Sequence, residues 1–82
     1  MLDADKKRWE SIVSRLKATA KEIETLAPTM YENLDDEDVD YVGTNLRWAS
    51  EWVLDGVDQI EDSLAFIKGP EAFSAYLDQR YK

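Results

Sequence analysis

Carboxylate side chains are concentrated in the middle of this 82-residue chain. Residues 35–68 contain ten acidic and two basic residues, whereas acidic and basic residues balance in 1–34 and in 69–82. The middle segment therefore carries the whole net charge of -8. Crowded carboxylates can bind a divalent cation, or they can attract the basic surface of another molecule.

Cation binding is the weaker of these two interpretations. Asp36, Asp38 and Asp40 are spaced like the first half of a calcium loop. However, Tyr41 takes the place of the loop's glycine, and Arg47 takes that of its bidentate glutamate. A magnesium-dependent, all-helical nucleotide hydrolase needs acidic residues on two facing helices, and only residues 55–62 supply one such side. The hydrolase is a minor alternative, and we expect no metal or cofactor.

The sequence also lacks the residue pairs of the common nucleophilic mechanisms, Ser with His and Cys with His. The chain contains no Cys and no His, so thiolate nucleophiles and the usual near-neutral base are missing. The one basic grouping, residues 6–8, lies among acidic residues, so the charge disfavours direct binding to nucleic acid. We therefore expect a protein that is not an enzyme.

Six of the acidic residues fall in one narrow sector when the middle segment is wound at 100° per residue. These residues, which we call the acidic ridge, are Glu37, Asp40, Glu51, Asp55, Asp58 and Asp62. Their spacing of ~5 to 6 Å is of the same order as the ~3.4 Å between phosphates along one DNA strand. The ridge is either a binding surface for a basic partner or a solvated face.

Large rings form a second sector beside the ridge. We call these residues the aromatic strip: Tyr41, Trp48 and Trp52, with Phe66 in line further along. Aromatic residues dominate the energy of protein interfaces, so an exposed strip predicts a binding surface. Another helix or a second copy of the chain covering the strip is the alternative.

The apolar spacing predicts three helices. The first covers residues 3–27, with Asp3 or Asp5 expected to cap its start and Pro28 expected to end it. Residues 28–33 form either a loop or a short helical turn. The second helix covers 35–68 and begins with a cap at Asp35, and a kink at Gly43 is an open alternative to a continuous helix. The third covers 70–81 after the Gly-Pro stop signal.

These elements predict an all-α fold in a single domain, residues 1–82. It is a long antiparallel helical hairpin with a short C-terminal third helix, forming a small three-helix bundle. The first helix should turn Trp9 and Leu26 inward, among other residues. The inner face of the second helix should be Val39, Val42, Leu46, Ala49, Val53, Val57, Ile60, Leu64 and Ile67. Single apolar stripes give only marginal stability, which favours a dimer or a partner protein.

The expected function is that of an inhibitor or adaptor. Its acidic ridge would capture a basic, nucleic-acid-binding surface of a partner protein, and its aromatic strip would supply affinity. Small acidic domains of this kind often block nucleic-acid-handling enzymes, including phage-targeted defence nucleases, as DNA mimics do. The alternative is a structural homodimer that pairs through the aromatic strip. With no secretion signal and no membrane-spanning apolar run in the sequence, we expect a cytoplasmic location.

Overall fold

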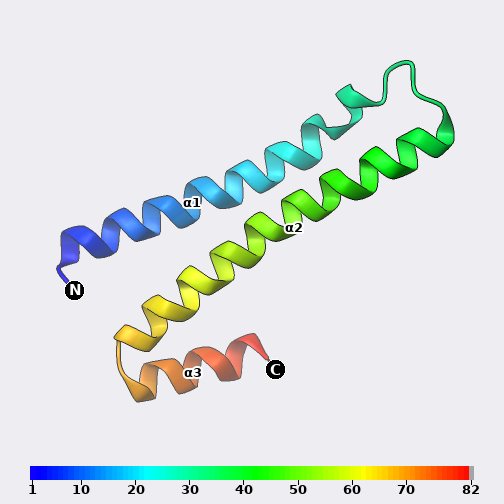
Figure 1. Ribbon diagram of the computed structural model, residues 1–82. Helices are drawn as coiled ribbons and strands as arrows, with labels where there is room; N and C mark the ends of the chain where they lie inside the picture. Colours follow the sequence, from blue (N-terminus) through cyan, green and yellow to red (C-terminus); the bar gives the residue numbers. More distant parts are fainter. Residues whose placement is uncertain (82) are drawn as a thin grey trace.

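The computed structural model describes residues 1–81, and within this range it contains helices and no strand. Helix α1 covers Asp3–Leu26 and continues into a 3-10 turn, η1, over Ala27–Met30. Helix α2 covers Asp36–Ile67, and helix α3 covers Pro70–Arg80. The three helices and their order confirm the predicted fold class (Figure 1).

An aspartate side chain caps the start of α2 but not the start of α1. The Asp35 side chain accepts a hydrogen bond from the backbone N–H of Asp38 at 2.8 Å, which caps α2 as predicted. The prediction that Asp3 or Asp5 caps α1 is wrong. The residue at the cap position is Leu2, and it makes no side-chain cap hydrogen bond. Both aspartates lie in the first turn instead, where their charge favours the helix dipole.

The segment between α1 and α2 combines a helical turn with a sharp change of direction. Pro28 lies within η1, so the short helical turn is the alternative that the structure adopts. Asn33 has a φ of 66°, in the left-handed region that asparagine tolerates better than most residues. The backbone then reverses; α2 begins beyond the end of α1 and runs back alongside it (Figure 1).

Helix α2 continues through Gly43 without a break. A Cβ atom at this position would lie 2.9 Å from the hydroxyl oxygen of Tyr31, which is closer than normal packing allows. The Tyr31 hydroxyl therefore approaches the helix closely at this glycine, and the helical backbone is not interrupted there.

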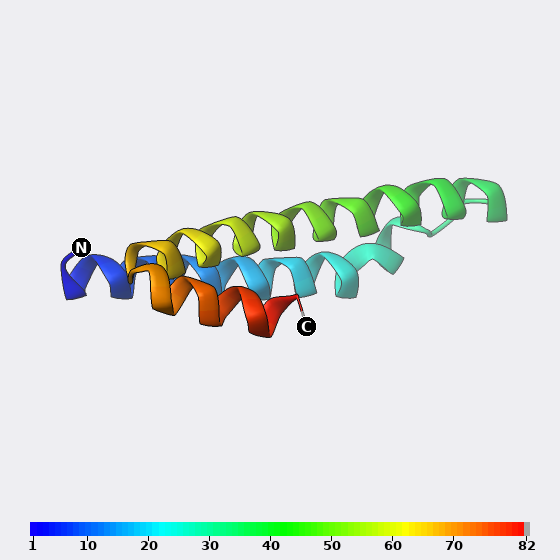
Figure 2. The same ribbon diagram turned by 90° about the horizontal axis from the view of Figure 1, so that it is seen from below.

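The helices form a thin slab rather than a closed globule. Helices α1 and α2 run antiparallel, and α3 folds back along α2 after Gly69, whose φ of 119° suits glycine (Figures 1 and 2). Within the described residues, α1 and α3 each contact α2 but do not contact each other. The Cα atoms span 52 × 29 × 12 Å, so the molecule is much thinner than it is long or wide.

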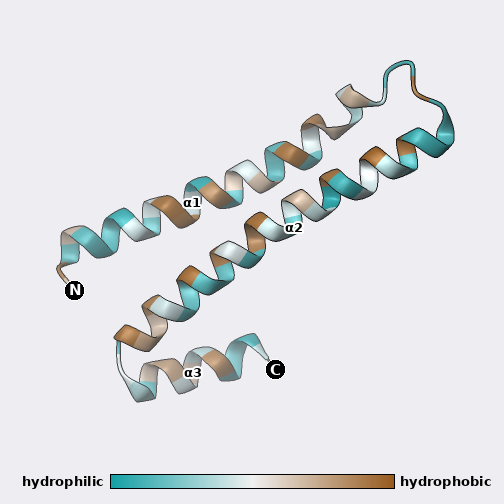
Figure 3. Ribbon diagram, in the orientation of Figure 1, coloured by the Kyte–Doolittle hydropathy of each residue, from teal (hydrophilic) through white to brown (hydrophobic). Residues whose placement is uncertain are grey.

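This shape encloses a very small core. Four apolar residues are buried: Val13, Ala20, Val57 and Ala65. Apolar residues recur along both long helices (Figure 3), but only those in the seam between helices are covered. Three residues predicted to face inward are instead largely exposed: Trp9 at 43%, Leu26 at 58% and Ile67 at 57%. The prediction was wrong for them because the slab has no second layer to cover them.

Ser50 is the one buried polar residue among those described, with 1% of its surface exposed. Its hydroxyl lies 3.1 Å from the carbonyl oxygen of Ala20 and 3.3 Å from Oε1 of Glu24, and both oxygens are acceptors. Satisfying a buried hydroxyl avoids a cost of about 1 to 3 kcal/mol. The contact therefore sets the alignment of α2 on α1 as well as filling the seam.

Across residues 1–81, none of the helices is at once long enough and apolar enough to cross a membrane.

Candidate protein-binding surface

The first part of the acidic ridge is free and fully accessible. Glu37, Asp40, Glu51 and Asp55 are all exposed on the outer side of α2. None of the four forms an ion pair with another of the described residues. Their negative charges are therefore available to an incoming basic group.

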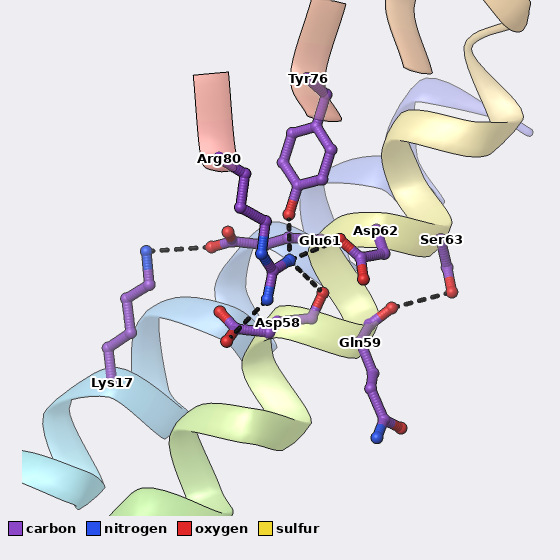
Figure 4. A network of polar contacts seen from close by, with 8 residues as sticks. All are labelled: Lys17, Asp58, Gln59, Glu61, Asp62, Ser63, Tyr76 and Arg80. Carbon is purple, nitrogen blue, oxygen red and sulfur yellow. Dashed lines mark hydrogen bonds and ion pairs between the residues drawn. The ribbon is translucent and has the colours of Figure 1, made fainter. Parts of the chain in front are cut away.

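The last part of the ridge is occupied by α3. Arg80 forms ion pairs with both remaining ridge residues, at 2.7 Å to Oδ2 of Asp58 and through Nη1 to Oδ1 of Asp62 (Figure 4). The same Nη1 donates to the backbone carbonyl of Asp58 at 3.3 Å and to the hydroxyl of Tyr76 at 2.6 Å. Asp58 and Asp62 thus hold α3 in place, and the structure separates them from the four free acids.

The groups around Arg80 stabilise its positive charge and the neutral form of Tyr76. Burial raises the pKa of the Tyr76 phenol, and the neighbouring Asp62 carboxylate raises it further. Partial burial disfavours the Arg80 cation, but the Tyr76 hydrogen bond and the charges of Asp58 and Asp62 outweigh this and raise its pKa. Arg80 therefore stays charged and Tyr76 stays neutral near neutral pH.

Sequence reasoning missed Arg80 and Ser50. The spacing of Arg80 four residues after Tyr76 puts both on one face of α3, which is a signal that they act together. Ser50 lies midway in the row Gly43, Ser50 and Val57, where residues seven apart share one face of a helix. This row marks the side of α2 that faces α1.

The basic residues of α1 leave the ridge uncovered. Lys17 forms the one ion pair between α1 and α2 in the described part of the chain, at 3.0 Å to Oε1 of Glu61. Glu61 lies outside the ridge, on the side of α2 nearer α1 (Figure 4). Among the described residues, no basic side chain of α1 forms an ion pair with any of the four free acids.

The aromatic strip is open to solvent beside these acids. Tyr41 is 72% exposed, Trp48 is 47% exposed and Trp52 is 70% exposed. Only the far end of the strip meets α3, where Phe66 packs edge-on against Phe73 with ring centroids 5.5 Å apart. The structure thus brings three free rings and four free carboxylates together on the outer side of α2.

The acidic side chains of the described residues are not grouped as metal ligands. No three acidic side chains among residues 1–81 converge closely enough to hold a metal ion. The arrangement instead combines long-range attraction for positive charge with apolar area, which is what a protein-binding surface needs.

Comparison of the chain with protein-family models, with curated proteins and with solved structures finds no match.

Proposed function

We propose that this protein is a non-enzymatic binding module that engages a basic, nucleic-acid-binding surface of a partner protein and acts as an inhibitor or adaptor. One observation carries the proposal: four unpaired carboxylates and three exposed rings share the outer side of α2 between Glu37 and Asp55. The rest of the molecule supports this surface, because α1 and α3 both pack against α2 and leave these side chains exposed.

The two kinds of side chain have separate roles in binding. The free carboxylates attract a basic surface over a distance of about one Debye length, ~10 Å at 0.1 M salt, and so raise the rate of encounter. The rings then supply affinity as they lose contact with water. Arginine on the partner suits both, because a guanidinium pairs with carboxylates and stacks on tryptophan faces.

The spacing of the free acids favours a partner with two basic clusters. Asp40 and Glu51 are separated by eleven residues, or ~16 Å along the helix, and Arg47 interrupts the gap. The ridge is therefore not a continuous copy of a phosphate backbone. We place its target among nucleic-acid-handling proteins of the cytoplasm, including defence nucleases, because their grooves combine separated arginine and lysine clusters with stacking surfaces.

A direct test uses a synthetic amphipathic, arginine-rich peptide of about 20 residues as the probe. Titration with this peptide is expected to change the tryptophan emission saturably at about 0.1 M salt and far less at about 1 M, where screening is strong. A peptide of equal length with glutamate in place of arginine is the control and should cause no change. The proposal is wrong if the arginine peptide has no effect, or if its affinity is the same at both salt concentrations.

A further inference from the structure

A second surface of α2 is uncovered, on the sector between the aromatic strip and the contact with α1. There α1 and α2 border a groove of about 400 Å³, which we call the apolar groove. None of the side chains that line it is ionisable, and those that matter here are Trp9, Gly56, Ile60, Ser63, Leu64 and Ile67. A Cβ atom at Gly56 would meet nothing within 4 Å, so the side of α2 at this point is bare backbone open to a close neighbour.

The spacing of residues along this sector is that of a helix-packing seam. Intervals alternate strictly between four and three along Ala49, Val53, Gly56, Ile60, Ser63 and Ile67. This heptad spacing is typical of helices that pack along their length against another helix. Because Gly56 is open and Ile67 is 57% exposed, α1 leaves part of the seam unfilled.

The chain exposes more surface than a folded monomer of its mass normally does, and the excess is large enough for a dimer interface. The accessible surface is 6593 Å², whereas a folded monomer of 9.5 kDa is expected to expose about 5,000 Å². A standard protein interface buries about 800 Å² on each partner. The excess therefore covers one such interface on each chain, and stacking a second layer on the slab gives the two-layer arrangement that helical domains need.

We propose that a second copy of this chain occupies the apolar groove, so that two hairpins stack face to face into a four-helix dimer. A twofold axis parallel to the long helices gives this arrangement. It leaves the direction of each helix unchanged and exchanges the two sides of the hairpin. Helix α1 of each copy then lies over α2 of the other, and the two grooves meet at the same end of the dimer.

The charges of the helices favour the orientation in which α1 of one copy lies over α2 of the other. Helix α1 carries six basic and five acidic residues, whereas α2 carries one basic and nine acidic residues. Placing α1 over α2 therefore pairs a nearly neutral helix with an acidic one. The other twofold stacking, α2 over α2, would oppose two strongly negative helices and is disfavoured.

The groove also provides complementary shapes for this pairing. Trp9 is 43% exposed at the groove, on the same level of the slab as the small residues of α2. In the twofold arrangement the Trp9 ring of the second copy lies over Gly56 and Ser63, where the absence of a large side chain leaves room for it. Each copy supplies one ring and one small-residue surface, as an isologous interface requires.

Dimerisation through the groove leaves the acidic ridge accessible. At 100° per residue, Gly56 and Ser63 lie roughly 100° around α2 from Asp55 and Asp62. The acidic ridges of the two copies therefore point outward, away from the interface and from each other. The alternative of pairing through the aromatic strip would instead bury the rings beside the ridge.

The test is the mass in solution of three variants, measured by light scattering after size exclusion over a wide range of concentration. The unaltered protein should have about twice the chain mass of 9.5 kDa. Gly56→Leu and Ser63→Leu should reduce the mass to that of one chain while circular dichroism stays helical, because both residues border the groove rather than the buried seam. Ser14→Leu, at an exposed position on α1 away from the groove, is the matched control and should remain dimeric.

The proposal is overturned if the unaltered protein has the mass of one chain, or if Gly56→Leu keeps the dimer mass. Binding of the arginine-rich peptide tests the proposed function separately from the proposed dimer. Gly56→Leu should bind the peptide as the unaltered protein does, whereas loss of peptide binding in a protein that remains dimeric would count against the ridge alone.

Discussion

Replacing Trp48 and Trp52 together by alanine is expected to weaken binding of the arginine-rich peptide by at least about 30-fold, or about 2 kcal/mol. Both rings are exposed, so their loss removes contact area from the proposed interface and little from the fold. Isothermal titration calorimetry measures the affinity, and thermal unfolding of the double variant should stay close to that of the unaltered protein.

A pair of tyrosines provides the matched control for this prediction. Tyr41 on the strip is 72% exposed, and Tyr81, beyond the end of α3, is 71% exposed. Tyr41→Ala should weaken peptide binding measurably, whereas Tyr81→Ala should leave it unchanged. Equal losses from the two tyrosine variants, or a loss of less than about 3-fold from the tryptophan pair, would show that the strip does not contact the peptide.

Reversing two free acids, Glu51→Lys and Asp55→Lys, is expected to lower the affinity for the peptide at least about tenfold at 0.1 M salt. Most of this loss should appear in the association rate, because exposed interfacial charges act mainly on encounter. Stopped-flow tryptophan fluorescence measures that rate. At about 1 M salt the variant and the unaltered protein should become nearly equal, since screening removes the attraction in both.

The control for charge reversal separates the position of the charges from their number. Glu22→Lys with Glu71→Lys changes the net charge by the same amount, but both residues lie off the ridge, on α1 and α3. This control should lose much less affinity. If both double variants weaken binding equally, net charge alone governs it. Asp58 and Asp62 are unsuitable for this purpose, because reversing them would break the ion pairs with Arg80 and release α3.

The helices could be predicted from the sequence because their end signals are local. Asp35 caps α2 with its own side chain, and the glycine with positive φ before Pro70 ends α2 and starts α3. Such signals act over a few residues, so they need no knowledge of the tertiary fold. The cap of α1 was predicted wrongly because the helix begins at Asp3, so both aspartates lie inside its first turn rather than before it.

The packing was harder to predict because it depends on contacts between distant residues. Periodicity shows which side of α2 is apolar, but it does not show that the slab lacks a second layer, which leaves Ile67 exposed. The use of Asp58 and Asp62 by Arg80 depends on where α3 folds back, 18 to 22 residues away along the chain. In the ridge, helical geometry alone identified six aligned acids, and only the tertiary structure divided them into four free and two paired.

The site of peptide binding can be observed directly by nuclear magnetic resonance, because the chain has three tryptophans and therefore three indole N–H signals. Trp48 and Trp52 lie in the aromatic strip, whereas Trp9 lies at the apolar groove. On titration with the arginine-rich peptide, the signals of Trp48 and Trp52 and the amides between Glu37 and Asp55 should shift, while Trp9 stays in place. Shifts at Trp9 with none at Trp48 and Trp52 would show that basic ligands do not bind at the acidic ridge.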